Sequence, residues 1–177
     1  MLGFFLIIGT ILILGTYLKL RKADKLKNIV FCASGGGHYA ELMQLKTVID
    51  ACEGIVITEK TGAVANTDGK IYYVPYSSRT EGFKYAFKFF RVCMVSLGHF
   101  VKFFPKTVIS TGAHSTIPLC FLAWLFRRKI IYIETIAVIT KPTLTGKLMY
   151  KIADVFYVQW EELLEVYPKA IYGGVLL

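Results

Sequence analysis

The sequence predicts an α/β fold, in which a mostly parallel, Rossmann-like sheet carries helices on both of its faces. Three observations lead to this prediction. Short apolar runs alternate with longer helix-forming stretches from residue 28 to residue 166. The apolar runs are continuous, as expected for strands that are covered on both faces. A glycine triplet, Gly35 to Gly37, follows the first run directly, where a strand-to-helix turn belongs.

Each element has its own local reason. β-branched and aromatic residues dominate the apolar runs, which favours strands. Helix-forming residues follow the glycines, and small hydroxyl residues that suit N-caps precede the later helices. The predicted strands are 28–33, 54–58, 70–74, 107–110, 129–133 and 155–158. The predicted helices are 39–51, 82–104, 116–126, 143–153 and 161–166.

The first eighteen residues contain no charged side chain, and a basic cluster follows them between Lys19 and Lys27. About 20 apolar residues suffice to cross a bilayer as a helix, and basic flanks stay on the cytoplasmic side. We therefore expect one transmembrane anchor at residues 1–20 and a cytoplasmic domain at residues 28–177. A cleaved signal peptide is the alternative, but the usual basic start and small-residue cleavage site are missing.

Composition fits a protein at a membrane surface. The chain has 177 residues, is 55% hydrophobic and has a net charge of +9, from 21 basic and 12 acidic residues. We find no nucleic-acid motif, no metal-ligand spacing and no paired cysteines among the four. The predicted helix 82–104 is basic on one side and aromatic elsewhere. It fits either a membrane-interface helix or a core helix with a solvated basic stripe.

The glycine turn is the leading candidate for a binding site. Backbone N–H groups and the helix dipole favour an anion there, and glycine lets a phosphate approach closely. His38 follows the turn, where it could pair with a phosphate or act as a base. The pattern Gly35-x-Gly37-x-x-Ala40, with Glu59 after the next strand, also fits a dinucleotide fingerprint. A dinucleotide-dependent oxidoreductase is therefore an alternative, although this length leaves no room for a substrate domain.

Two further loops after predicted strands carry polar residues. The loop at 110–116 holds His114, which could form a second wall of the same cleft or be a surface histidine beside helix-capping hydroxyls. Glu134 closes a hydrophobic strand, which is a costly place for a charge unless it serves a ligand or a partner.

Several of these motifs, in this order along the chain, resemble the membrane-anchored glycosyltransferase subunits of the asparagine-linked glycosylation protein fourteen family. The bacterial, PssD-like branch that builds capsular polysaccharide and exopolysaccharide looks closest, and the chain also resembles the N-terminal half of MurG. The motifs are Ser34-Gly35-Gly36-Gly37-His38, Val108 to His114, Ile131 to Glu134, Pro142 to Lys147, and Val158 through Tyr172-Gly173-Gly174.

The resemblance implies one half of a GT-B glycosyltransferase. This chain would bind a sugar on a polyprenyl diphosphate in the membrane, and a separate soluble partner would bind a UDP-sugar donor. The heterodimer would share that donor as its substrate, with no covalently bound cofactor, no metal and no nucleic acid. The bacterial plasma membrane is then preferred over the endoplasmic reticulum.

The resemblance also assigns residues to roles. His38, Glu134 and His114 would be the catalytic candidates. The acceptor diphosphate would lie against Ser34, Gly35, Gly36, Gly37, His38, Thr111 and Gly112. The partner would dock on Tyr172, Gly173, Gly174, Val175, Leu176 and Leu177.

One position departs from the pattern. Bacterial relatives often carry an arginine at about the place where this chain has Val138, so either another cation, Lys141 or Arg79, supplies the missing positive charge or the chain is less active. A purely scaffolding membrane anchor is a further alternative, and it would keep partner recruitment without a role in the chemistry.

Overall fold

The computed structural model describes residues 29–60, 71–78 and 82–176. The predicted anchor, residues 1–20, lies outside these residues. Seven strands form one parallel sheet in the order β3-β2-β1-β4-β5-β6-β7. The strands are β1 (Ile29–Ala33), β2 (Ile55–Glu59), β3 (Ile71–Val74), β4 (Thr107–Gly112), β5 (Lys129–Ile133), β6 (Val155–Val158) and β7 (Ile171–Tyr172).

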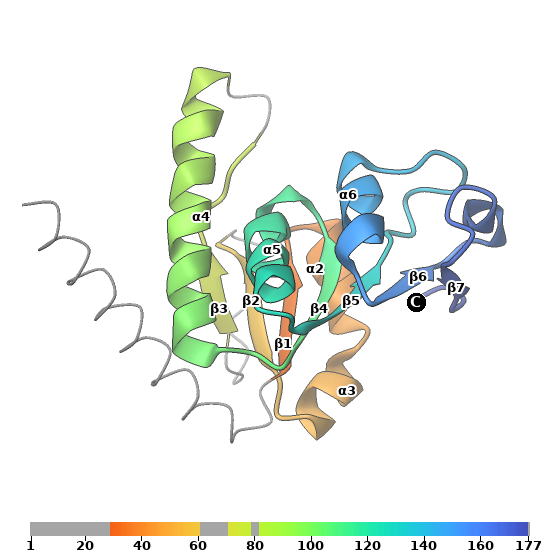
Figure 1. The fold of residues 1–177 in the computed structure, drawn as a ribbon, viewed down its shortest axis with the longest axis horizontal. Coiled ribbons are helices and arrows are strands. Elements are labelled where there is room, and N and C mark those ends of the chain that lie inside the picture. The colour runs from red at the N-terminus through yellow and green to blue at the C-terminus, as the bar shows by residue number, and fades with distance from the viewer. Residues whose placement is uncertain (1–28, 61–70, 79–81, 177) are drawn as a thin grey trace, which may run out of the picture.

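Helices cover both faces of the sheet, as predicted (Figure 1). On one face lie α4 (Phe83–Phe103), α5 (Ile117–Leu125) and α6 (Leu144–Ile152), and on the other lie α2 (Gly37–Met43) and α3 (Lys46–Ala51). Two short 3-10 helices, η2 (His114–Thr116) and η3 (Glu161–Leu164), follow β4 and β6.

Alternating side chains of β1 belong to two separate hydrophobic cores. Val30 and Cys32 belong to the large core under α4, α5 and α6, whereas Phe31 and Ala33 belong to a smaller core under α2 and α3. All four are at most 1% exposed, because successive side chains of a strand point to opposite faces and both faces are covered. This burial explains why the run reads as continuously apolar in the sequence.

The strand order reverses direction at β1. From β1 the chain passes through α2 and α3 to β2 on one side, while β4 pairs with β1 on the other side. In open parallel sheets a crevice forms beyond the carboxyl ends of the strands at such a switch point, and ligands bind there. The glycine turn after β1 and the loop after β4 therefore meet at the expected place.

Three element predictions were wrong in detail. The single helix expected at 39–51 is two helices, separated by a tight turn in which the Gln44 and Leu45 N–H groups donate to carbonyls three residues back. β4 continues two residues beyond its predicted end, to Gly112. The predicted helix at 161–166 is only a four-residue 3-10 turn, and β7 was not predicted. Within the described segments, no helix combines the length and the apolar character needed to cross a bilayer.

Candidate functional site

The glycine turn lies at the carboxyl end of β1, next to β4. Gly36 has a φ of 70°, a left-handed conformation that strains other residues, and it directly precedes α2. A Cβ at Gly36 or Gly37 would meet nothing within 4 Å, so this side of the turn is open. The first N–H groups of a helix have no acceptor within the helix. The turn can therefore present N–H donors to an anion.

Gly35 connects the glycine turn to the end of β2. Its N–H donates to Oε2 of Glu59 over 2.9 Å, and Glu59 is only 3% exposed at the end of β2. This bond ties the glycine turn to the neighbouring strand. It occupies one oxygen of the acid that a dinucleotide site would need at the ribose hydroxyls, while Oε1 has no hydrogen-bond partner among the described residues.

His38 is clamped to β4 by a reciprocal pair of hydrogen bonds. Its Nδ1 lies 2.9 Å from the carbonyl oxygen of Thr111, and the Thr111 hydroxyl donates to the His38 carbonyl over 2.9 Å. Because a carbonyl oxygen can only accept, Nδ1 carries the proton of the neutral ring. The clamp therefore leaves Nε2 with its lone pair, ready to accept a proton.

Gly112 provides the surface against which the His38 ring lies. Its φ is 92°, and a Cβ there would lie 3.4 Å from Cε1 and Nδ1 of His38 and 3.0 Å from the Tyr132 hydroxyl. The peptide bond between Gly112 and Ala113 is cis. Glycine is thus required at this position both by its backbone angle and by the close approach of two rings.

Ser34 joins β1 to β4 rather than facing the open side of the turn. Its N–H donates to the Gly112 carbonyl over 2.7 Å, and its hydroxyl accepts from the Ala113 N–H over 3.3 Å. The side chain is 5% exposed. Ser34 therefore helps to hold β1 against the loop after β4.

His114 points toward the connection between β3 and α4. Its Nε2 lies 2.9 Å from the Ser77 carbonyl oxygen and 3.1 Å from the Ser77 hydroxyl. The ring also lies near Tyr85 and Phe89 of α4, at centroid distances of 5.9 Å and 6.5 Å. His114 thus links η2 to the segment that follows β3.

Glu134 is completely buried at the end of β5. Its carboxylate accepts hydrogen bonds from the Thr135 N–H at 3.2 Å, the Thr143 hydroxyl at 3.1 Å and the Tyr167 hydroxyl at 3.1 Å. Thr143 is also the N-cap of α6 and accepts from the Gly146 N–H at 2.7 Å. Glu134 therefore holds the start of α6 in place through its hydrogen bond with Thr143.

The same enclosure shifts two ionisation equilibria. Burial raises the pKa of the Glu134 carboxyl above its ordinary value, although its three hydrogen-bond donors and nearby His38 act in the opposite direction. Burial and the neighbouring Glu134 also raise the pKa of the Tyr167 hydroxyl far above its usual range. Both groups therefore act as hydrogen-bonding partners within the fold.

A cavity of about 460 Å³ lies beside His38, between α2 and the loop that follows β5. Its size falls in the range of roughly 300–1,000 Å³ that small-molecule sites occupy. Its polar walls come from His38, Glu41, Gln44 and Thr135. The remaining lining residues are Gly37, Ala40, Ile136, Ala137 and Leu176. Of the three catalytic candidates, His38 alone is among the described residues that line this cavity.

A comparison with known families decides the classification. The family described as "Oligosaccharide biosynthesis protein Alg14 like" matches residues 74–176. The chain belongs to this Alg14-like family. The match covers the loops that hold His114 and Glu134 and the tail that was predicted to dock a partner.

Individual relatives of this Alg14-like chain carry the name UDP-N-acetylglucosamine transferase subunit ALG14. The relative from Debaryomyces hansenii is 26% identical over 177 residues, covering 85% of this chain and 76% of its own length. That from Yarrowia lipolytica is 34% identical, over 41% of this chain and 37% of its own length. That from Candida albicans is 32% identical, over 52% of this chain and 42% of its own. The chain thus spans less than half the length of two of these relatives. All three are fungal, so they give no support to the bacterial branch.

Solved structures agree on the fold. MurG from Acinetobacter baumannii superposes with a TM-score of 0.61 at 15% identity, covering 77% of this chain and 42% of MurG. A UDP-N-acetylglucosamine 2-epimerase described from Listeria monocytogenes superposes with a TM-score of 0.58 at 14% identity, covering 77% of this chain and 40% of the other. The Alg14-like chain therefore has the fold of one half of MurG.

The structure brings some predicted site residues together and separates others. The glycine turn, His38, Thr111 and Gly112 meet in the crevice between β1 and β4. Glu134 instead bonds to Thr135, Thr143 and Tyr167. His114 bonds to Ser77. Among the described residues, no group of three His, Cys, Asp or Glu side chains could hold a metal ion.

The predicted tail packs partly onto its own sheet. Tyr172 of β7 pairs with Val158 of β6, and the Gly173 N–H donates to the Val158 carbonyl at 3.0 Å. The Leu176 N–H donates to Gln159 Oε1 at 2.8 Å. Tyr172 remains 45% exposed. Leu177 lies outside the described residues.

Of the two cations proposed to replace the missing arginine, the structure describes only Lys141. Arg79 lies outside the described residues, and Lys141 is exposed. Val138, at the position of the arginine, packs against the large core.

Sequence reasoning missed Glu41, Thr135 and Ile136, which lie together in the cavity wall. One signal was available for Glu41: it follows His38 by three residues, which is the spacing of neighbours on one helix face. No comparable local pattern marks Thr135 or Ile136, because only the fold brings them to α2.

Proposed function

We propose that this chain is the acceptor-binding subunit of a two-component, UDP-sugar-dependent hexosyltransferase of the GT-B type. The observation that carries the proposal is the His38 ring, held by Thr111 so that Nε2 can accept a proton, at the wall of an open cavity. The relatives' shared name supports a transferase subunit. The fold of half of MurG supports a division into two chains.

The acceptor would be a sugar on a polyprenyl diphosphate. Its diphosphate would lie against the open N–H groups after Gly36, and its sugar would enter the cavity beside His38. Thr111, Gly112 and Ser34 would support this site by holding the His38 ring and the turn in position. Glu134 would not contact the sugar itself. It would position the loop after β5, which forms the cavity wall opposite α2.

The chemistry assigned to this chain is one proton transfer. The acceptor hydroxyl oxygen attacks the anomeric carbon of the donor sugar, and the bond from that carbon to the UDP oxygen breaks. UDP leaves with the bonding electrons, and the hydroxyl proton passes to Nε2 of His38. The donor and the positive charge that stabilises departing UDP belong to the partner, so the chain is inactive alone.

The partner would dock beside the carboxyl ends of the strands, along the tail. Leu176 of the tail lines the cavity, and Ile171 and Tyr172 of the edge strand β7 are exposed. A partner held there would face His38 across the crevice, where GT-B enzymes react their two substrates. We assign the complex to lipid-linked oligosaccharide or polysaccharide biosynthesis, including the bacterial capsule branch.

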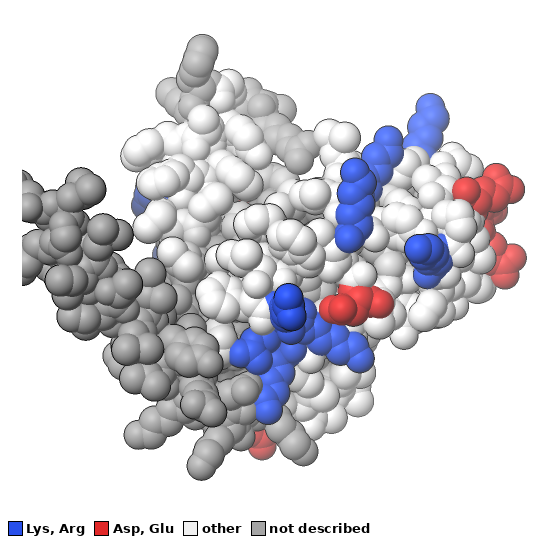
Figure 2. Space-filling view, viewed as in Figure 1, with Lys and Arg blue, Asp and Glu red and all other residues white. Residues whose placement is uncertain are grey.

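Membrane attachment gains support from the exposed face of α4 and α5. Phe87 and Phe90 are 68% and 60% exposed, and Met94, Leu97 and Val101 continue the same side of α4 at helical spacing. Figure 2 shows this face largely free of charged side chains. Such an exposed apolar stripe suits the boundary between headgroups and acyl chains.

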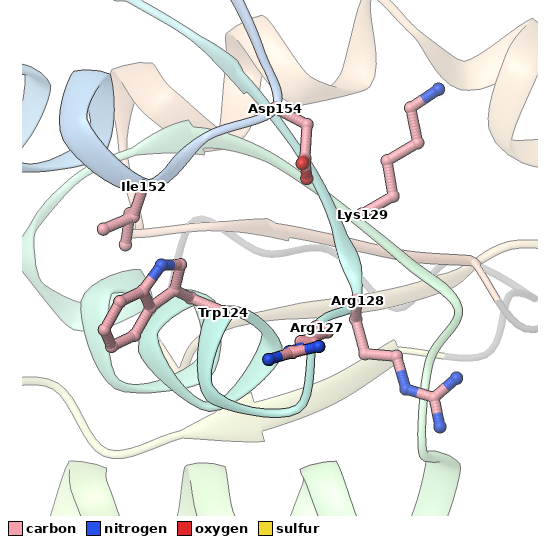
Figure 3. A pocket seen from close by; sticks show the side chains of 6 residues that line it. All are labelled: Trp124, Arg127, Arg128, Lys129, Ile152 and Asp154. Atoms are coloured by element: carbon pink, nitrogen blue, oxygen red, sulfur yellow. The ribbon is translucent and has the colours of Figure 1, made fainter.

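A basic cluster borders this face at the amino end of the sheet. Arg127, Arg128 and Lys129 surround a cavity of about 450 Å³ together with Trp124 and Asp154 (Figure 3). β1 begins at the same end of the parallel sheet, so the residues before Ile29 join the domain there. Cations beside an apolar face favour an anionic lipid surface. We therefore propose a single-pass protein with its domain on the cytoplasmic face.

Quenching of Trp124 fluorescence tests this orientation. Trp124 is 47% exposed on α5, and the full-length protein can be reconstituted into vesicles whose lipids carry brominated acyl chains. We expect strong quenching that disappears in Trp124→Phe, which retains the second tryptophan, Trp160. Equal quenching of both proteins, or none in either, would contradict the orientation.

Equilibrium binding tests the division between acceptor and donor. The full-length chain in detergent is titrated calorimetrically with three probes, in which glucose, galactose or N-acetylglucosamine is joined through a diphosphate to a ten-carbon isoprenoid. UDP-N-acetylglucosamine is titrated in parallel. We expect the chain alone to bind at least one lipid-linked probe and not the UDP-sugar. Binding of UDP-N-acetylglucosamine without any lipid-linked probe would reverse the assignment.

A further inference from the structure

Glu41 is a buried acidic residue in the wall of the cavity beside His38. It lies on α2, three residues after His38, so both side chains project from the same side of the helix. Its side chain is only 7% exposed. Asp50, by contrast, lies on the neighbouring α3 and makes an exposed ion pair with Lys46.

One oxygen of the Glu41 carboxylate is fully occupied. Oε1 accepts from the Thr135 hydroxyl at 2.7 Å and from the Ile136 N–H at 3.0 Å. These bonds join α2 to the loop after β5, the two walls of the cavity. They hold the carboxylate in one orientation, so Oε2 is held in place as well.

The other oxygen, Oε2, is buried and has no hydrogen-bond partner in the part of the chain that the structure describes. A buried polar atom without a hydrogen-bond partner is energetically unfavourable, and more so when it is charged. Glu41 lines the cavity beside His38, so a group bound in that cavity can supply the missing partner.

We propose that Oε2 of Glu41 accepts a hydrogen bond from a hydroxyl group of the acceptor sugar. This inference rests on the proposed function and names the group that orients the sugar. A carboxylate repels a phosphate, so Glu41 marks the sugar end of the site and the glycine turn marks the diphosphate end. With one hydroxyl held by Glu41, another is presented to Nε2 of His38, and the cavity distinguishes sugars by where their hydroxyls lie.

The test uses Glu41→Gln and the three lipid-linked probes described above. The glutamine carbonyl can keep the bonds to Thr135 and Ile136, so the melting temperature should not change. Its amide replaces Oε2 with a neutral donor, which forms a weaker bond to a hydroxyl. We expect about tenfold weaker binding of the best probe. Asp50→Asn, which removes an exposed carboxylate from the neighbouring helix, is the matched control and should bind like wild type.

Deoxygenated versions of that probe identify the hydroxyl. For one of them, the wild type should lose about as much affinity as Glu41→Gln has already lost, whereas Glu41→Gln should lose little more. Equal probe affinity of wild type and Glu41→Gln would overturn the role of Glu41 while leaving the proposed function intact. Weaker association with the donor-binding chain at unchanged probe affinity would also overturn it, because Glu41 would then pair with a partner cation. If wild type binds none of the three probes, the acceptor role itself fails.

Discussion

Replacing His38 with asparagine is expected to lower the rate of sugar transfer by about 100- to 10,000-fold, the usual contribution of a general base. The asparagine Nδ2 takes nearly the position of the histidine Nδ1 and can still donate to the Thr111 carbonyl. The clamp between α2 and β4 is therefore kept, while the proton acceptor at Nε2 is removed. The rate is measured with the complete two-chain enzyme at saturating acceptor and donor.

His99→Gln is the matched control for this variant. His99 lies on α4, and its Nε2 contacts the Tyr73 carbonyl oxygen at 3.0 Å, a bond that the glutamine amide can reproduce. We expect this control to transfer sugar within about twofold of the wild-type rate. A His38→Asn enzyme with wild-type turnover would show that the base lies elsewhere, and the partner would then be the place to search.

Replacing Gly146 with alanine is expected to lower the free energy of unfolding by about 3 kcal/mol, at the upper end of the usual cost of overpacking. A Cβ at Gly146 would overlap Oε2 of Glu134 and lie 2.7 Å from the Tyr167 hydroxyl. Glu134 would have to leave Thr143 and Tyr167, and the start of α6 would lose its support. For a protein of this size, the melting temperature should fall by roughly 6–12 °C.

Gly98→Ala separates this packing effect from the general effect of alanine in a helix. Gly98 is an exposed residue inside α4, and a Cβ there would meet nothing within 4 Å. Alanine should therefore leave stability unchanged or raise it by up to about 1 kcal/mol. Thermal unfolding followed by circular dichroism compares the two variants. Equal melting temperatures for both would contradict the buried role that we assign to Glu134.

Most of the sheet was predictable because central strands such as β1 and β2 are buried on both faces. Continuous apolar runs at 129–133 and 155–158 coincide with β5 and β6. The division of helix 39–51 was not predictable, because no glycine or proline marks the turn at Gln44 and Leu45. β7 has two exposed residues and exists through its pairing with β6, so local sequence carries little sign of it.

The candidate site was predictable where one local pattern defines it. The glycine turn and His38 lie together because a strand-to-helix turn brings them together. Partners far apart in sequence were not predictable: His114 bonds to Ser77, 37 residues away, and Glu41 bonds to Thr135, 94 residues away. The sequence indicated that the Glu134 charge needed compensation, but only the fold identifies Tyr167 as a donor.

Transfer of radiolabelled sugar to lipid tests the central claim most directly. Membranes containing this chain alone, its soluble partner alone, or both are supplied with UDP-sugars and a lipid-linked acceptor. The account predicts product only when both chains are present, and product formation at least about 100-fold slower with His38→Asn in place of the wild-type chain. Transfer by this chain alone would place a donor site within it and contradict the division into acceptor and donor subunits.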